Sequence, residues 1–338
     1  MRLRGLLRAM LALSLLLVAG PSWAGAPIRA GYQSFCNPWK AAIASGAFEA
    51  ATGREIRFIR FESDAEVMKA MAAGKIDVGE AGSGAIAAGL GRGVGVELFW
   101  IVDDVAMAEA FVARRGTFID PAKPETLKGK RIGVTRDSTS HFQTLAALDL
   151  WKVAPGDVRL VDLQPQGMAA AWDKGEIDAA FVRDPVLGHL KRDGKVMLTS
   201  GDLAQEGRPS FDGMVGRTAF VAANPSFMIR FAETMAKADT AYHDGKNAWT
   251  AASEPVARIV GLTGGEAEGV PIALGLYHFP TLDEQVSQRW LGGGAADILR
   301  KTALFLRRNG AVERVLDDYA PYVTPRYARA AVRPLADG

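Results

Sequence analysis

Residues 74–84 read GKIDVGEAGSG, and residues 175–185 read GEIDAAFVRDP. Each stretch follows a segment with helical spacing of its apolar residues, and both contain Gly, a charged residue, Ile and Asp in that order. The shared residues Asp77 and Asp178 are predicted to bind backbone groups where a strand begins. The repeat predicts two related units, each with this segment as its third strand. The alternative is chance similarity between two common helix-to-strand turns.

The first unit reads as strand, helix, strand, helix, strand. Its strands are predicted at residues 27–33, 54–62 and 76–79. Asn37 and Pro38 are typical of a helix start, and Ser63 with Glu66 forms a capping box for the second helix. The second unit repeats this order, with strands predicted at residues 130–135, 157–163 and 176–182. Such alternation favours mostly parallel sheets flanked by helices.

Two further strands connect the units. Residues 109–116 are predicted to leave the first lobe, and residues 210–225 are predicted to return to it. We therefore expect an α/β protein whose two lobes face each other across a cleft. The predicted parts are a signal peptide at 1–24, first-lobe segments at 25–110 and 215–338, and the second lobe at 111–214. Ligands of open parallel sheets bind at the carboxyl ends of the strands, which here line the cleft.

The N-terminus has the composition of a secretory signal. Three arginines precede an apolar run at residues 9–20, and residues 22–24 fit a small-x-small cleavage pattern. The alternative, a buried helix, fits the charged flank less well, and the run is too short to span a membrane. Removing the signal lowers Lys+Arg from 40 to 37 against 38 Asp+Glu, so the net charge changes from +2 to −1. We expect an exported, periplasmic protein without a lipid anchor.

Several function classes lack their sequence signals. No basic tract suggests binding of nucleic acid. The four histidines, at positions 141, 189, 243 and 278, lack the spacing of metal ligands, and no phosphate-binding glycine motif occurs. The single cysteine, Cys36, allows no intrachain disulfide and is a weak signal of a nucleophile. We therefore expect no cofactor, no metal and no catalysis.

Hydroxyl groups at the start of a predicted helix are candidate anion ligands. Ser138, Thr139 and Ser140 stand beside free backbone N–H groups at the positive end of that helix, which suits an anion. The alternative is ordinary capping, which needs only one hydroxyl. Gly82 and Ser83 offer close backbone approach from the facing lobe.

Charged residues near the predicted cleft are candidate ligand contacts. Arg183 ends a strand, where a guanidinium can hold a sulfonate, phosphonate or carboxylate; the alternative is a structural pair with Asp184. Glu80, taken as the matching position in the other lobe, and Asp212, on the returning strand, can each hold an ammonium group or serve a structural role. Phe35 is a candidate for ligand contact or for the core.

Longer stretches of the chain resemble one protein family. They are AGYQS at 30–34, MAAGKIDVGEAGSGAIAAG at 71–89, LKGKRIGV at 127–134, STSHFQTLAAL at 138–148, VRLVDLQPQGMAAAWDKGEIDAAFV at 158–182, SFDGMVG at 210–216 and DYAPYVTPRY at 318–327. Over nearly the whole mature chain the sequence resembles periplasmic substrate-binding proteins of ABC transporters for taurine and related alkylsulfonates. The resemblance implies the two-lobed fold of a type II periplasmic binding protein, which closes on its ligand and delivers it to a membrane permease and its ATPase. We expect it to be a monomer.

The resemblance also implies roles for individual residues. Ser34, Ser83, Thr139 and His141 match ligand contacts, and Asp212 matches the carboxylate that holds the amine. Hydroxyls and helix N-termini would then hold the sulfonate. The full set of candidate ligand residues is Ser34, Phe35, Asn37, Glu80, Gly82, Ser83, Ser138, Thr139, Ser140, His141, Arg183, Asp184 and Asp212.

Two places depart from the family pattern. Arg183 and Asp184 stand where the family usually has an aromatic and an uncharged small residue, and Glu80 replaces an uncharged residue before the Gly-Ser turn. These charges leave open another ligand: a more polar amino-sulfonate, an aminophosphonate, an amino acid or a quaternary amine. A further alternative is an enzyme on the same fold, similar to the pyrimidine-precursor synthases of thiamin biosynthesis. Those enzymes rely on several cysteines, whereas this chain has only Cys36.

Overall fold

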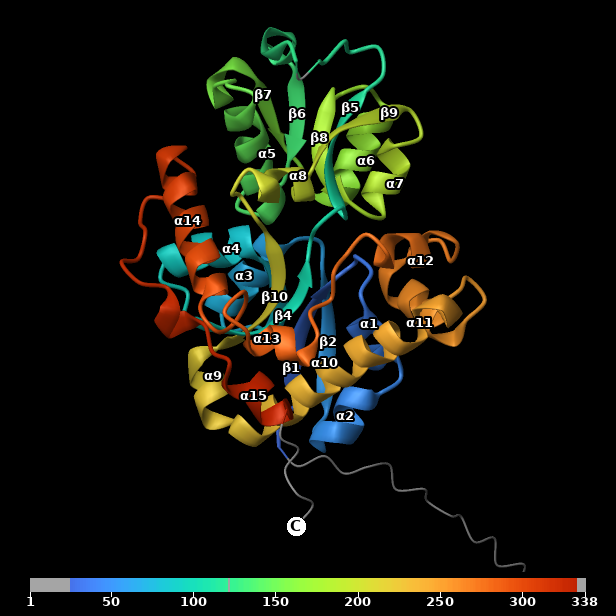
Figure 1. Cartoon of the computed structure of the whole chain (residues 1–338), viewed down its shortest axis with the longest axis vertical. Coiled ribbons are helices and arrows are strands. Elements are labelled where there is room, and N and C mark those ends of the chain that lie inside the picture. The colour runs from blue at the N-terminus through green and yellow to red at the C-terminus, as the bar shows by residue number, and fades with distance from the viewer. Residues whose placement is uncertain (1–24, 121, 333–338) are drawn as a thin grey trace, which may run out of the picture.

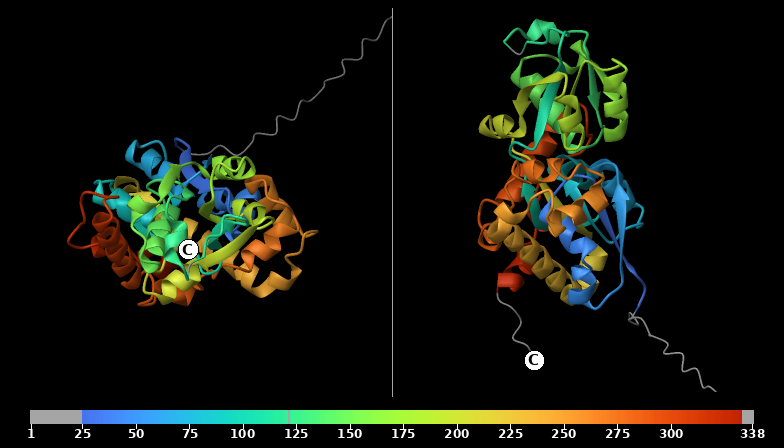
Figure 2. Two further views of the ribbon diagram at one scale, coloured as in Figure 1. Left: turned by 90° about the horizontal axis from the view of Figure 1, so that it is seen from above. Right: turned by 90° about the vertical axis from the view of Figure 1, so that its right-hand side faces the viewer.

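The computed structural model describes residues 25–120 and 122–332. The predicted signal peptide at 1–24 and the end of the chain at 333–338 lie outside these ranges. Two lobes, each built on a five-stranded sheet, stand one above the other (Figure 1; Figure 2). The predicted two-lobed α/β fold is therefore confirmed. Within the described ranges, no helix combines the length and the apolar character needed to cross a membrane.

The first sheet contains the first unit of the repeat. Its strands are β1 (Ile28–Gln33), β2 (Ile56–Phe61), β3 (Val78–Gly82), β4 (Val96–Asp104) and β10 (Phe211–Arg217). They lie in the order β2-β1-β3-β10-β4. β1 is parallel to β2 and β3, whereas β10 is antiparallel to both of its neighbours, β3 and β4. The chain that returns from the second lobe therefore enters the first sheet between two of its strands.

The second sheet repeats this arrangement. Its strands are β5 (Glu109–Arg114), β6 (Arg131–Val134), β7 (Arg159–Asp162), β8 (Ala179–Arg183) and β9 (Gly194–Thr199). They lie in the order β7-β6-β8-β5-β9. β6 is parallel to β7 and β8, and β5 is antiparallel to β8 and β9. β5 thus takes the place in this sheet that β10 takes in the first.

Both sheets are mixed: four strands of each run in one direction, and the fifth, β10 or β5, runs against them. The parallel strands of each unit end at the side facing the other lobe, whereas β5 and β10 arrive from the other lobe and begin there. A strand that begins where its neighbours end must run antiparallel to them. The strand predicted at 109–116 belongs to the second sheet, and the one predicted at 210–225 ends at Arg217, where a helix begins.

Helices flank each sheet (Figure 1). Those of the second lobe are α5 (Thr139–Leu150), α6 (Pro165–Asp173), α7 (Val186–Leu190) and α8 (Ser200–Gln205). Those before the second lobe are α1 (Pro38–Ala44), α2 (Ala47–Thr52), α3 (Asp64–Ala72) and α4 (Ser83–Gly91). Those after β10 are α9 (Thr218–Ala223), α10 (Pro225–Gly245), α11 (Glu254–Thr263), α12 (Gly269–Leu274), α13 (Leu282–Val286), α14 (Gly294–Arg308) and α15 (Arg326–Val332).

The repeat builds the same scaffold in both lobes. The backbone N–H of Arg29 donates to Asp77 Oδ2 at 2.9 Å, and that of Arg131 donates to Asp178 Oδ2 at 2.8 Å. Each guanidinium also binds the other oxygen of the same carboxylate, at 2.8 Å and 2.6 Å respectively. The prediction that the two shared Asp residues bind backbone groups is confirmed.

Sheet register fixes which residues of the two copies correspond. β3 pairs with β1 and β8 pairs with β6 in the same register, so the two third strands align from their first residues. Glu80 then corresponds to Phe181, and Gly82 corresponds to Arg183. The expected match between Glu80 and Arg183 is therefore wrong by two residues, which along a strand is a displacement of about 6.6 Å.

Helix α14 contacts both lobes. It packs against α4 of the first lobe, while Phe305 and Leu306 near its end join the core of the second lobe. The Phe305 ring meets the Phe142 ring of α5 edge to face, with 5.6 Å between centroids. The lobes are therefore linked by the β4–β5 connection, by the segment before β10 and by α14.

Candidate functional site

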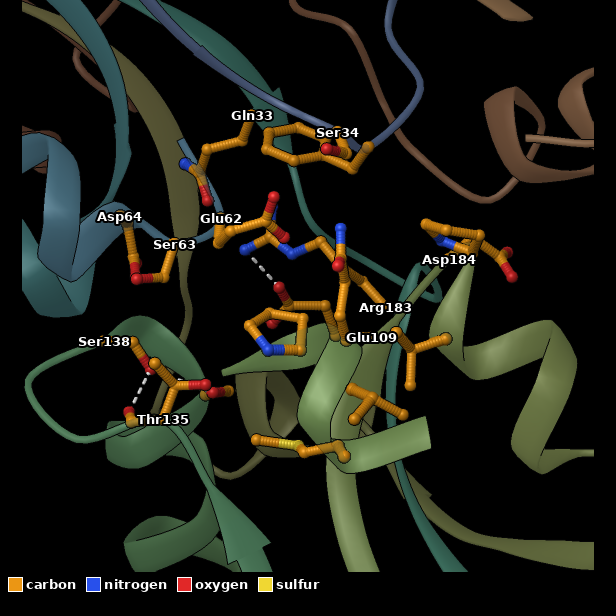
Figure 3. A pocket seen from close by; sticks show the side chains of 18 of the residues that line it. Gln33, Ser34, Glu62, Ser63, Asp64, Glu109, Thr135, Ser138, Arg183 and Asp184 are labelled. Atoms are coloured by element: carbon orange, nitrogen blue, oxygen red, sulfur yellow. Dashed lines mark hydrogen bonds and ion pairs between the residues drawn. The ribbon is translucent and has the colours of Figure 1, made fainter. Parts of the chain in front are cut away.

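A pocket with a volume of about 120 Å³ lies between the lobes, where the parallel strands end (Figure 3). It is open to solvent and small beside the roughly 300–1,000 Å³ of sites for drug-sized molecules. The predicted ligand residues that line it are Ser34, Phe35, Ser138, Ser140, Arg183 and Asp184. They come from the segment after β1, from the start of α5 and from the end of β8, as expected for a site at strand ends.

Arg183 is held in this pocket by two carboxylates. Its Nη1 lies 2.7 Å from Asp212 Oδ2, and its Nη2 forms an ion pair with Glu109. Its guanidinium carbon lies 4.2 Å from the centre of the Phe35 ring, a cation–π contact. Burial acts to lower the pKa of Arg183, but the charges of Asp212 and Glu109 outweigh burial and hold the pKa well above its usual value. Arg183 is therefore a fixed cation.

Asp212 and Asp184 differ in how they meet Arg183. Asp212 is fully buried on β10, and its ion pair with Arg183 joins the first lobe to the second. An amine at Asp212 would therefore compete with Arg183 for this carboxylate. Asp184 lines the pocket, but its Oδ1 accepts the N–H of Gly188 at 2.8 Å. The structural pair of Arg183 with Asp184, left open on sequence, is replaced by the pairs with Asp212 and Glu109.

Three acidic residues that line the pocket were not predicted from the sequence: Glu62, which is partly exposed, and the buried Glu109 and Asp64. Glu109 is the first residue of β5, and its Oε2 is buried without a hydrogen-bond partner among the described residues. Burial raises the pKa of Glu109 to about 7, against the opposing effect of Arg183. Asp64 is the first residue of α3, and its Oδ2 accepts the N–H of Thr139 at 2.9 Å. Burial raises the pKa of Asp64 as well.

Neither buried acid has a distinctive sequence signal. Asp64 follows the helix cap Ser63, and acidic residues are common in the first turn of any helix because they suit its dipole. Glu109 starts a predicted strand, where a polar residue at the edge of an apolar run is ordinary. Only the fold shows that both side chains reach the same pocket.

The two turns predicted to hold an anion from opposite sides touch each other. The N–H of Gly84 donates to Thr139 Oγ1 at 3.1 Å, and a Cβ atom at Gly82 would lie 2.0 Å from the same hydroxyl. Gly82 therefore supplies the close approach that was predicted, but to Thr139. Ser83 is also occupied within the protein, because its Oγ accepts the N–H of Phe211 at 3.3 Å.

The start of α5 is partly used by the protein itself. Ser138 is the N-cap, and its Oγ accepts the N–H of His141 at 3.2 Å and donates to the Thr135 carbonyl. His141 is buried, its Nδ1 accepts the N–H of Asp137 at 3.3 Å, and burial lowers its pKa, so the ring is neutral. His141 lies outside the pocket lining, whereas Ser138 and Ser140 remain in it.

Glu80 is an internal anchor of the first lobe. Its carboxylate accepts hydrogen bonds from the Gln33 N–H at 3.0 Å, the Asn37 amide at 2.5 Å and the Trp39 indole at 2.9 Å. Lys40 Nζ lies 3.1 Å from the same carboxylate, and both charged side chains are fully buried. Contrary to prediction, Glu80 and Asn37 do not face the pocket, because they bind each other and their own lobe.

Cys36 is not an activated thiol. Burial raises its pKa to about 11, although the nearby charge of Lys40 acts in the opposite direction. A thiol with this pKa is protonated at neutral pH and is a poor nucleophile. In residues 25–120 and 122–332, no group of three or more His, Cys, Asp or Glu side chains is placed to hold a metal ion.

The chain is similar to known binding proteins in sequence. It matches the model of the NMT1-like family over residues 31–256. It is 32% identical to the taurine-binding periplasmic protein of Escherichia coli (strain K12) over 302 residues, which cover 89% of this chain and 92% of the relative. It is 27% identical to a putative aliphatic sulfonates-binding protein of Bacillus subtilis (strain 168), over 62% of this chain and 64% of the relative.

The fold is shared with solved structures of lower identity. The alkanesulfonate-binding protein SsuA of Xanthomonas axonopodis pv. citri, bound to MOPS, superposes with a TM-score of 0.73 at 19% identity, covering 88% of this chain and 98% of that one. The desulfurization enzyme DSZB superposes with a TM-score of 0.59 at 16% identity, covering 90% and 99%. The fold alone therefore serves binding proteins and an enzyme.

The sequence comparisons support a more specific family assignment than the structural superpositions do. The family model spans most of the described chain, and the identity to the Escherichia coli protein extends over nearly the full length of both. The two-lobed architecture and the pocket between the lobes agree with this relationship. The chain is thus a member of the NMT1-like family and a relative of the periplasmic taurine-binding protein.

Proposed function

We propose that this protein is the periplasmic solute-binding component of an ABC importer and that it binds a small zwitterionic amino-sulfonate such as taurine. The relationship to a taurine-binding periplasmic protein supports the class of protein. A pocket between two lobes supports binding by closure, which excludes water and strengthens charged contacts. One observation carries the ligand class: the fixed guanidinium of Arg183 shares the pocket with a buried oxygen of Glu109 that has no hydrogen-bond partner within residues 25–120 and 122–332.

The anionic group of the ligand is assigned to Arg183 and nearby hydroxyls. A guanidinium has five N–H donors, so Arg183 keeps donors for a ligand beyond its contacts with two carboxylates. The Ser34 hydroxyl is buried without a partner among the described residues, and Ser138 and Ser140 stand at the same pocket. A sulfonate suits this set because its three oxygens can accept from the guanidinium and from two hydroxyls at once.

The ammonium group is assigned to Glu109 and Asp64. Glu109 Oε2 has no partner in the part of the chain that the structure describes, and an ammonium placed there gains a charge-assisted hydrogen bond. Asp212 holds this role by resemblance to the family, but its two oxygens lie 2.7 Å and 3.4 Å from the nitrogens of Arg183. In this chain Arg183 takes the place of the ammonium at Asp212, so the amine moves to the next carboxylates.

Binding rather than catalysis is the better account of the site. The thiol of Cys36, with its pKa raised to about 11, is a poor nucleophile at neutral pH. The polar side chains of the pocket are instead arranged as a fixed cation beside carboxylates, which is what recognition of a zwitterion requires. We infer that the protein acts as a monomer in the periplasm and hands its ligand to a membrane permease and its ATPase.

A thermal-shift and calorimetric screen tests the ligand class. It compares taurine, alkylsulfonates without an amine, aminophosphonates and amino acids. Taurine at about a hundred times its Kd should stabilise the fold by about 2.7 kcal/mol. If millimolar taurine gives no stabilisation while an amino acid does, the sulfonate assignment is wrong.

A pair of variants tests the assignment of the amine. Glu109→Gln should weaken the binding of taurine at least tenfold. It should weaken the binding of an alkylsulfonate without an amine much less. The matched control is Glu125→Gln, an exposed acid of the second lobe that does not line the pocket. Equal losses of affinity for ligands with and without an amine would show that Glu109 has a purely structural role.

A further inference from the structure

Two buried carboxyl groups stand side by side behind the pocket. Asp103 on β4 pairs directly with Asp212 on β10 in the antiparallel register. Residues paired in this way point to the same face of a sheet, with Cβ atoms about 4.5–5.5 Å apart. Both side chains are fully buried. Two like charges at this spacing and away from water repel each other, so we expect one of the pair to hold a proton.

The surroundings decide which carboxyl is protonated. Both oxygens of Asp212 accept hydrogen bonds from the guanidinium of Arg183. Both oxygens of Asp103 are buried without a partner among the described residues. An ionised Asp103 would leave a buried charge unsatisfied, whereas a protonated Asp103 can donate to Asp212.

The other groups facing Asp103 do not neutralise it. They are Asp212 of β10, Arg183 of β8, Glu80 of β3, Lys40 of α1 and Tyr277 of the segment after α12. Lys40 is bound to Glu80, and Arg183 is shared between Asp212 and Glu109. Each of these two cations already has its own carboxylate, so neither is free for Asp103.

We propose that Asp103 is a positioning residue that holds a proton and through it donates a hydrogen bond to Asp212, which orients Asp212 to fix Arg183 in the pocket. Asp103 does not touch the ligand; it acts through Asp212 and Arg183. The consequence for ligand affinity rests on the proposed function, whereas the protonation itself is a property of the free protein.

The sign of the pH dependence follows from the protonated state. Burial raises the pKa of Asp103 well above its usual value, and the charge of Asp212 raises it further. The folded protein therefore binds a proton that the unfolded chain has lost. Stability attributable to Asp103 then falls as pH rises from the unfolded pKa of about 4 towards the folded pKa.

Ligand-free unfolding tests the proton directly. Wild type and Asp103→Asn are unfolded with urea at a series of pH values between about 5 and about 9, because an amide mimics a carboxyl that keeps its proton. The folding constant of wild type relative to D103N should fall by up to tenfold per pH unit. Asp104→Asn, the neighbouring acid that pairs with Arg289, is the matched control and should show no such slope. A ratio independent of pH overturns the proposal.

Ligand affinity tests the positioning role. Taurine binding is measured by calorimetry for wild type, D103N and Asp103→Ala from about pH 6 to about pH 9.5, and each affinity is divided by that of D103N so that titration of the ligand amine cancels. D103A should bind at least tenfold more weakly, because Asp212 loses its donor, and D103N should restore most of that loss. Relative to D103N, wild type should weaken as pH rises.

The two experiments separate the possible failures. If no amino-sulfonate binds but the ligand-free slope is present, the proton on Asp103 stands and the proposed ligand is wrong. If taurine binds and D103N is as weak as D103A, a donor at this position is not what orients Arg183, and the positioning role is overturned.

Discussion

The two lobes share a scaffold but end their third strands differently. In each lobe an Asp at the strand entry binds the backbone and guanidinium of an Arg on the next strand. β8 then ends in Arg183, which enters the pocket, whereas the corresponding residue of β3 is Gly82, which lets Thr139 approach. The repeat thus specifies the sheet. The residue at the end of the third strand decides whether a lobe places a charged side chain in the pocket, as Arg183 does, or a glycine against the other lobe, as Gly82 does.

The position two residues earlier differs in another way. Phe181 in β8 is buried in an apolar core, and the corresponding Glu80 in β3 is equally buried but charged. A buried carboxylate is costly unless it is paired and hydrogen-bonded. The first lobe meets this requirement with Lys40, Asn37 and Trp39. Five predictions, in order of decreasing effect, test how far the lobes are alike.

Removal of the Lys40 charge should give the largest effect. Lys40→Met leaves Glu80 buried without its cation, and breaking a buried ion pair from one side costs about 3–5 kcal/mol of unfolding free energy. Urea titration followed by circular dichroism measures the loss. The double variant K40M/E80Q should recover much of it. A loss in K40M below about 1 kcal/mol would contradict the anchor role, since surface pairs already reach that value.

The shared Asp residues should be similar in weight, with the larger loss at Asp77 because it also pairs with Arg217. Asp77→Ala and Asp178→Ala each remove hydrogen bonds to charged and backbone groups, and each should lower the unfolding free energy by about 1.5–3 kcal/mol. Urea titration of both variants gives the comparison. If one variant loses less than half as much unfolding free energy as the other, the two Asp residues do not contribute similarly to stability.

These two carboxylates should also make the fold acid-sensitive. Burial acts to raise the pKa of each, but hydrogen bonds from Arg29 and Arg217 lower the pKa of Asp77, and those from Arg131 lower that of Asp178. A lowered folded pKa gives stability that is present above the unfolded pKa of about 4 and is lost as pH falls through the folded value. Unfolding between about pH 5 and about pH 2 should therefore be steeper in wild type than in either Ala variant.

The strand ends should differ in their effect on ligand. Arg183→Ala should weaken ligand binding at least tenfold, or by about 1.4 kcal/mol, because it removes the cation fixed in the pocket. Arg183→Lys should recover only part of this, since an ammonium cannot reproduce bidentate contacts. Arg136→Ala is the control: this arginine also follows a strand of the second lobe but is half-exposed. Calorimetric affinities unchanged in R183A would contradict the assignment.

The smallest effect is expected at the exposed bridge between the lobes. Arg92 of the first lobe pairs with Asp137 of the second, and both side chains are partly exposed. Such pairs are worth about 0–1 kcal/mol. Arg92→Ala should therefore change ligand affinity by less than about fivefold, with the loss declining further in high salt. A loss as large as that of R183A would place a closing contact at the surface instead of in the pocket.

Local pattern predicted more of the fold than of the site. The two units, their strand order and the structural role of Asp77 and Asp178 could be read from periodicity and turn residues, because those signals are short-range. The direction of β5 and β10 could not, because it depends on where a connection crosses between lobes. The same applies to Glu80: its cation is Lys40, forty positions earlier, and no local pattern links the two.

The pocket itself was predicted unevenly for the same reason. Arg183 and Ser138 could be found because a charge at a strand end and hydroxyls at a helix start are unusual enough to notice. Glu109 and Asp64 could not, because an acid at the start of a strand or in the first turn of a helix is ordinary. Asp212 was found, but its partner was not, since sequence alone does not show that Arg183 lies opposite.

The contact of α14 with both lobes has a mechanical consequence. Two chain crossings alone would allow the lobes to rotate relative to each other about one hinge axis. Phe305 seated against Phe142 adds a third support beside that axis. Wide opening must slide these rings past each other, so separation combines rotation with shear and meets resistance that grows with its amplitude. The protein thus has a built-in stop on how far its lobes can part.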